Sequence, residues 1–174
     1  MAWFDMIREK LGTMGISGLG VTGTSNKVLT ESDFTLNTTI SVPADEWTRL
    51  AYYTVSAQNE YEYGYGNGAQ PYNQGYVYVF LKDTTGNEVE GKVRFVVVDA
   101  NDVPKAPPVF EDDASTLHAS LSDITQMKPL PRTGVVAGED DKLVIEVKCS
   151  SAQTISGTRT LLKIPVTNRW TRRV

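Results

Sequence analysis

The sequence has little of what metal and nucleophile chemistry needs. Its 174 residues include one cysteine, Cys149, and one histidine, His118. A lone cysteine excludes an intramolecular disulfide and cysteine-rich metal sites, and Cys149 continues an apolar alternation that predicts a small buried side chain. His118 falls on the polar side of a weakly alternating stretch, so we expect it at the surface. We therefore expect no metal site and no cofactor.

Acid–base catalysis is not expected either. The adjacent pairs Asp45–Glu46 and Asp140–Asp141 are the candidates for the two carboxyl groups that flank a bond in a glycosidase. Neighbouring acidic residues in loops are ordinarily solvated, and no stretch has the alternate spacing of a helix–loop–helix calcium site. The sequence thus predicts a protein that is not an enzyme.

Long apolar runs and an excess of positive charge are also missing. No segment approaches the about 20 apolar residues of a membrane span, and the N-terminus lacks a basic region followed by an apolar core. We expect a protein that is soluble when made. The net charge of −4 argues against a protein that coats nucleic acid, and no sequence-specific nucleic-acid partner is expected.

The charge is unevenly distributed along the chain. No Asp or Glu occurs after Glu146, although several cations do, and this predicts a basic C-terminal tail over residues 168–174. The candidate contacts of this tail with a membrane or another anionic partner are Arg169, Trp170, Arg172 and Arg173; the alternative is a disordered, solvated end. At the other end, residues 3–14 have the apolar spacing of a short amphipathic helix, and a glycine-rich stretch completes an N-terminal arm over residues 1–26.

Between these ends, residues 27–167 show the pattern of an all-β domain. Alternating or β-branched runs are separated by Pro and Gly connections, as in a single jelly roll of about eight antiparallel strands; an immunoglobulin-like sandwich is the alternative. The predicted strands are Lys27–Thr30, Phe34–Val42, Arg49–Ala57, Tyr76–Lys82, Glu88–Asp99, Leu117–Met127, Lys142–Cys149 and Thr158–Thr167. Pro165 suggests that the last strand lies at an edge or ends early.

The two runs 76–81 and 93–98 predict a central antiparallel hairpin. In the second run, Val93, Phe95 and Val97 share one face, while Arg94 opens an opposite face that Val96 and Val98 continue. Both runs offer apolar side chains on two faces, which is typical of strands in the middle of a sheet.

Two segments are candidate interfaces. All eight tyrosines lie between Tyr52 and Tyr78, and the segment 58–75, rich in Gly, Asn and Gln, is predicted to be a long loop that carries Tyr61, Tyr63, Tyr65 and Tyr72. Such a loop suits recognition of a protein or sugar surface, or packs on its own domain. The segment 103–110 contains Pro107 and Pro108, which predict an extended crossover between two sheets.

The strand pattern, the start WFDMIREKLG with its glycine-rich arm and the end NRWTRRV resemble the single-jelly-roll capsid proteins of internal-membrane-containing icosahedral viruses, in particular the smaller capsid protein of Thermus phages and their haloarchaeal relatives. The resemblance implies a virion protein, soluble in the host cytoplasm before assembly, that forms homo-oligomers and joins a second capsid protein in a shell over a lipid membrane.

Two other functions remain open at this point. A carbohydrate-binding spike or adhesin module would use Trp47 and the tyrosines Tyr61, Tyr63 and Tyr65 as stacking platforms for sugar rings. A decoration or adaptor protein of a tailed phage head would share the same physics and differ only in its partner.

Overall fold

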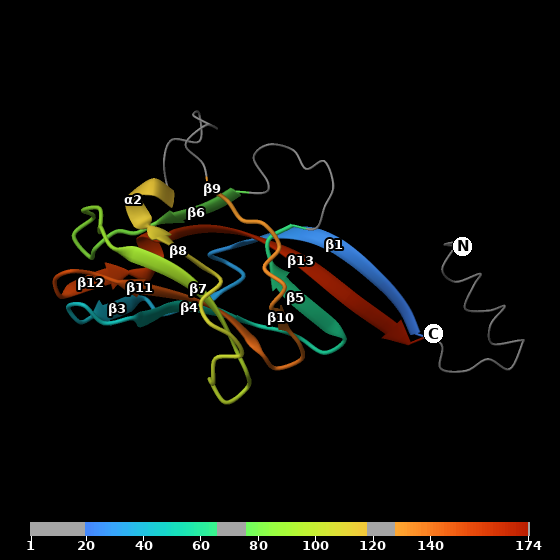
Figure 1. Cartoon of the computed structure of the whole chain (residues 1–174). Helices are drawn as coiled ribbons and strands as arrows, with labels where there is room; N and C mark the ends of the chain where they lie inside the picture. The colour runs from blue at the N-terminus through green and yellow to red at the C-terminus, as the bar shows by residue number, and fades with distance from the viewer. Residues whose placement is uncertain (1–19, 66–75, 118–127, 174) are drawn as a thin grey trace, which may run out of the picture.

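The computed structural model describes residues 20–65, 76–117 and 128–173, which form two facing antiparallel sheets and a short ladder (Figure 1). The six-stranded sheet contains β1 (Gly20–Thr30), β5 (Asn59–Tyr63), β6 (Tyr76–Phe80), β9 (Lys128–Pro129), β10 (Val136–Ala137) and β13 (Leu161–Arg173). The five-stranded sheet contains β2 (Thr35–Leu36), β4 (Thr48–Thr54), β7 (Lys92–Val98), β8 (Phe110–Asp113) and β11 (Lys142–Lys148). The remaining elements are the paired β3 (Thr39–Val42) and β12 (Gln153–Ser156), the helical turn α2 (Ala114–Leu117) and the 3-10 turn η2 (Gly157–Arg159).

The core lies between the two large sheets and follows the alternation of the sequence. Val77 and Val79 of β6 are buried, and so are Val93, Phe95 and Val97 of β7, which belong to the same apolar cluster. The outer face of β7 carries a second, smaller cluster, which joins Val96 and Val98 to Val144 and Tyr52. The predicted division of β7 into two apolar faces is therefore confirmed.

The predicted central hairpin is wrong, because β6 and β7 lie in different sheets. The two segments pair only at an isolated bridge between Lys82 and Glu88, beside a turn in which Asp83 accepts the backbone N–H groups of Thr85 and Asn87. The chain then crosses to the other sheet. A strand with apolar residues on both faces suits the middle of any sheet, so its residue pattern does not identify the strand with which it pairs.

The last strand, β13, is the central strand of the six-stranded sheet. It pairs with β1 along eleven residues, from Gly20 opposite Arg173 to Thr30 opposite Lys163, and with β5 and β6 at successive places. In Figure 1 β1 and β13 leave the body side by side as a curved ribbon. This differs from the sequence-based boundaries, because residues 20–26 of the predicted arm and 168–173 of the predicted tail are strand.

Pro165 lies in the middle of β13, so the expectation that it marks an edge or an early end is wrong. Its carbonyl accepts the N–H of Gly64 at 2.8 Å, just beyond the end of β5. Since N–H and C=O of one strand residue point to the same side, the donor that proline lacks would also face Gly64. The ladder between Pro165 and its partner Val28 in β1 therefore loses no bond.

Other predicted elements are shorter than expected or lie elsewhere. The predicted strand 34–42 divides into β2 and β3, which belong to different ladders. Of the predicted strand Leu117–Met127, Leu117 ends α2, while residues 118–127, with His118, lie outside the described residues, as does the predicted helix 3–14. Cys149 is buried, as predicted, and burial raises the pKa of its thiol.

Candidate interaction surfaces

Two of the four candidate tyrosines belong to the core. Tyr61 and Tyr63 lie in β5 with exposed fractions of 5% and 0%, so their predicted placement in a loop is wrong. The Tyr63 hydroxyl crosses the core and donates a 2.9 Å hydrogen bond to the carbonyl of Val144 in the opposite sheet. The alternation of residues 59–63, with both tyrosines on one face and Glu60 and Glu62 on the other, is the signal that identifies this strand.

The other two tyrosines keep their candidacy. Tyr65 is half-buried just after the turn at Gly64, where φ is +91°, and bridges Pro131. Burial raises the pKa of Tyr65. Tyr72 lies outside the described residues. Their predicted role at an interface remains a prediction.

Pro107 and Pro108 line a groove on the outer face of the five-stranded sheet. The segment 99–109 leads into β8 and runs beside β7, held by backbone bonds from the N–H of Lys105 to the carbonyl of Val97 and from the N–H of Val109 to the carbonyl of Phe95, both 2.9 Å. The groove encloses about 460 Å³. Its lining includes Arg49, Arg94, Glu146, Pro104, Pro107 and Pro108. Both candidate prolines are exposed there, as a contact with another protein requires.

Cations cover the aromatic rings on this face. The guanidinium of Arg94 lies 4.2 Å and the ammonium of Lys148 5.2 Å from the centre of the Trp47 ring. Arg94 also donates to Glu146 at 2.6 Å. With Trp47 engaged by cations and Tyr61 and Tyr63 buried, Tyr65 alone remains of the four stacking platforms assumed for a carbohydrate-binding module, and that function is not favoured.

The basic residues near the C-terminus are strand residues. Arg169 directs its guanidinium to Glu62, with 3.4 Å between Nη2 and Oε2. Trp170 is half-buried across from Gly23, where a Cβ atom would come within 2.0 Å of the indole ring. Arg172 and Arg173 are the last described residues of β13. Two of the four candidate contacts, Arg169 and Trp170, thus make contacts within the chain.

Among the residues that the structure describes, the most buried charge is the carboxylate of Glu62, which the sequence did not single out. The residue is 2% exposed and accepts hydrogen bonds from Nε of Arg132 at 2.8 Å and from the N–H of Gly134 at 2.6 Å. These contacts hold the segment before β10 against β5. A period-two pattern predicts that Glu62 faces away from the core, but Arg132, which covers it, is 70 positions away in the chain.

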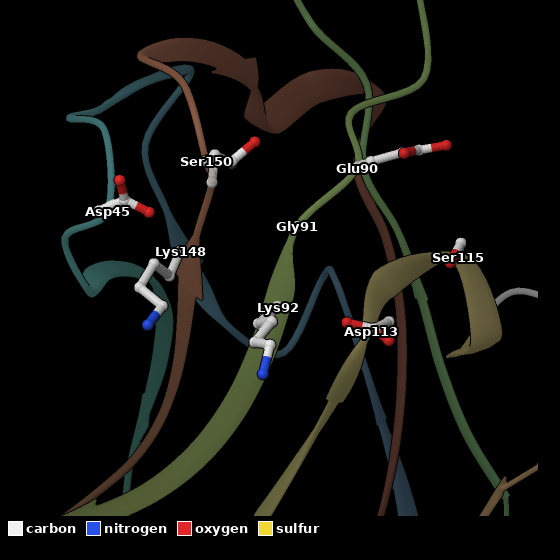
Figure 2. Close-up of a pocket in the computed structure, with 9 residues that line it drawn as sticks. Asp45, Glu90, Gly91, Lys92, Asp113, Ser115, Lys148 and Ser150 are labelled. Carbon is white, nitrogen blue, oxygen red and sulfur yellow. The ribbon is translucent and has the colours of Figure 1, made fainter.

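A further pocket of about 460 Å³ lies where β7 begins and β11 ends. Figure 2 shows Asp45, Lys148, Lys92 and Asp113 following one another across it, so carboxylates and ammonium groups are mixed. In the described parts of the chain, no three His, Cys, Asp or Glu side chains are grouped to hold a metal ion. Likewise, no helix in those parts is long and apolar enough to cross a membrane.

No protein-family model and no curated protein matches the sequence. Among solved structures, the chain is similar to VP17, a capsid protein of bacteriophage P23-77, with a TM-score of 0.59 and 14% identity over 88% of this chain and 99% of that one. It is also similar to the VP16-VP17 complex of the two major capsid proteins of that phage, with a TM-score of 0.57 and 14% identity over 87% of this chain and 100% of the other. The chain has the fold of a phage capsid protein.

This fold confirms the predicted all-β, jelly-roll class and the resemblance to capsid proteins of a Thermus phage. The structural similarity covers 99% of VP17, so it is not confined to one part of that protein. Because identity is 14%, the likeness concerns the fold and transfers no residue role.

Proposed function

We propose that the chain is a structural, non-enzymatic subunit of a viral capsid, which accumulates as a soluble protein in the host cytoplasm and then assembles into an icosahedral virion shell. The observation that carries the proposal is the likeness in fold to VP17 over almost the full length of both chains. A stiff two-sheet body with contact surfaces at its loops and edges suits repeated packing in a shell.

The proposal includes two protein partners, further copies of this chain and a second capsid protein. Support for the second partner comes from the VP16-VP17 complex, in which two major capsid proteins of one phage are bound together. The candidate contacts are Pro107 and Pro108 on the outer groove, Tyr65 just after β5, and Tyr72, which lies outside the described residues. Chemical cross-linking of assembled particles, read by mass spectrometry, tests them; cross-links confined to other surfaces would remove these four residues from the interface.

A lipid contact is the third element of the proposal. Arg172 and Arg173 end the ribbon, and each arginine near an anionic surface contributes about 1 kcal/mol to binding. Replacing both by Gln is expected to reduce sedimentation of the protein with phosphatidylserine liposomes at low salt. The matched control is Lys163→Gln, an exposed position at the other end of β13. Equal sedimentation of all three proteins would remove the lipid contact from the proposal.

Electron microscopy of the purified protein tests the capsid function itself. We expect defined oligomers or curved shells as concentration and salt are raised, with growth followed by light scattering. A protein that stays monomeric under all conditions, alone and with the other proteins of its virion, would overturn the proposal.

A further inference from the structure

The two large sheets have edges of very different length. In the described part of the chain, the outermost strands β2, β9 and β10 have two residues each and β8 has four, whereas β1 has eleven. Strand β1 pairs with β13 on one side, and no described strand pairs with its other side. A long unpaired edge is a template for a further strand, and proteins ordinarily shorten or block such edges.

The backbone bonds of β13 show which groups of β1 face the open side. The carbonyl of Pro165 and the N–H of Thr171 both bond to the β5 side, to Gly64 and Gln58. Strand residues alternate in the side to which their backbone groups point, so the odd-numbered residues of β13 face β5. Pro165 lies opposite Val28, and the even-numbered residues of β1 therefore direct N–H and C=O away from β13.

Thr30 agrees with this assignment and ends the open edge. Its N–H donates to Oδ2 of Asp33 at 2.9 Å, and its carbonyl accepts the N–H of Asp33 at 2.9 Å. Asp33 thus takes both groups that Thr30 would offer to another strand.

Apart from Gly20 at the very start of the strand, the groups left open belong to Thr22, Thr24, Asn26 and Val28. The first three side chains are exposed and that of Val28 is half-buried. Strand β1 has no proline, and its one charged residue is Lys27. The edge therefore carries little of the charge and none of the proline with which edges are blocked.

We propose that β1 pairs antiparallel with β1 of a second copy of this chain, about a two-fold axis at Ser25, so that one sheet runs through both copies. The residues from Thr22 to Val28 are centred on Ser25. In this register Thr22 faces Val28 of the second copy and Thr24 faces Asn26, so that open groups meet open groups from Thr22 to Val28, while Gly20 lies opposite the closed Thr30.

Side chains favour this register over its neighbours. The β-branched Thr22 and Val28 face each other, whereas a shift of the axis to Thr24 places Gly20 opposite Val28 and loses a stabilising cross-strand pair. Lys27 faces Gly23, so the two lysines of the pair lie about 14 Å apart along the strands rather than opposite each other.

This inference goes beyond the proposed function and rests on the geometry of the β1 edge alone. If the chain is a capsid subunit, the β1 pair is one defined contact between its copies. The first test is a disulfide at the axis. In Ser25→Cys the two thiols occupy directly opposed positions that form no backbone bonds with each other, with Cα atoms about 4.5 Å apart, within the range of a disulfide. We expect a disulfide dimer on mild oxidation. The wild type, with its buried Cys149, is the blank.

Thr22→Cys is the control for register. Its thiol lies about 20 Å from its counterpart in the second copy and is not expected to cross-link. Absence of the Ser25→Cys dimer, or equal dimer from Thr22→Cys, would overturn the inference.

Light scattering provides a test without cysteines. We expect the wild type at twice its chain mass of 19.2 kDa and Thr24→Pro at the chain mass, because proline removes an open-edge donor and leaves the ladder to β13 intact. Thr24→Val keeps the donor and the dimer. A dimer that survives Thr24→Pro, or an edge that pairs only with a different virion protein, contradicts the inference. If the protein forms shells but Ser25→Cys gives no disulfide dimer, this inference fails and the proposed function stands. If the dimer forms but no shell is ever observed, the proposed function fails and this inference stands.

Discussion

The hydrogen bond from Tyr63 to Val144 gives a direct measure of how the two sheets are held together. The hydroxyl is fully buried, and its 2.9 Å bond ends on a backbone carbonyl of the opposite sheet. Tyr63→Phe removes only the oxygen and leaves the ring in place beside Phe95, whose centroid is 5.2 Å away. The change therefore tests the bond and not the packing.

The expected loss follows from the burial of the bond. A buried hydrogen bond whose acceptor is left without this partner costs about 1–2 kcal/mol, and 1 kcal/mol lowers Tm by about 2–4 °C in a chain of this size. We expect Tyr63→Phe to melt about 3–6 °C below the wild type in calorimetry or circular dichroism. Tyr78→Phe, on the half-buried face of β6, is the matched control and is expected to leave Tm unchanged. Equal melting temperatures for Tyr63→Phe and the wild type would refute the reasoning.

The same side chain predicts a dependence on alkaline pH. Burial, and then the negative charge of Glu146, raises the pKa of Tyr63 well above its usual value of 10.0. The folded protein thus holds this proton more tightly than the unfolded chain, so the stabilisation is complete below pH 10 and is lost as the pH rises above it. Between about pH 10 and 11 the Tm of the wild type should fall more than that of Tyr63→Phe; parallel curves would contradict this.

Two substitutions and one labelling experiment test other parts of the structure. Glu62→Gln leaves Arg132 without its charged partner and should cost about 3 kcal/mol in urea unfolding, whereas exposed Glu60→Gln should cost little; equal losses would contradict the buried pair. Gly157→Ala places a Cβ 2.0 Å from the carbonyl of Asn37 and should cost about 1–3 kcal/mol in the same assay, unlike Gly138→Ala, where the nearest atom is 3.7 Å away. The Cys149 thiol should react slowly with a disulfide reagent until urea unfolds the chain, because burial raises its pKa; fast native labelling would show an open site.

The sequence predicts what depends on local pattern. Strands with period two, the two faces of β7 and the burial of Cys149 follow from neighbouring residues, and the jelly-roll class follows from the order of strands and breaks. The pairing of strands does not follow from local pattern. Strand β6 is apolar on one face and half-buried on the other, so it suits a neighbour in either sheet. The predicted hairpin with β7 therefore fails, although both strands exist.

The candidate surfaces likewise combine features that local sequence predicts with contacts that it does not predict. Composition identifies a tyrosine-rich segment, but two of its rings, Tyr61 and Tyr63, alternate with glutamates and enter the core. The covered face of Trp47 and the buried Glu62 depend on arginines that lie far away in the chain, 47 to 70 positions from their partners. Contacts of this range are absent from any local window of sequence.

The pairing of β1 with β13 also constrains the synthesis of the protein. The first described strand finds its partner among the last residues of the chain, with more than 130 positions between Thr30 and Lys163. During synthesis on the ribosome, β13 is the last strand to emerge. Until then β1 has no strand of the six-stranded sheet with which to pair. Contacts between distant residues also slow folding. Any product truncated before β13 lacks the strand with which β1, β5 and β6 all pair, so that sheet cannot form without the last residues of the chain.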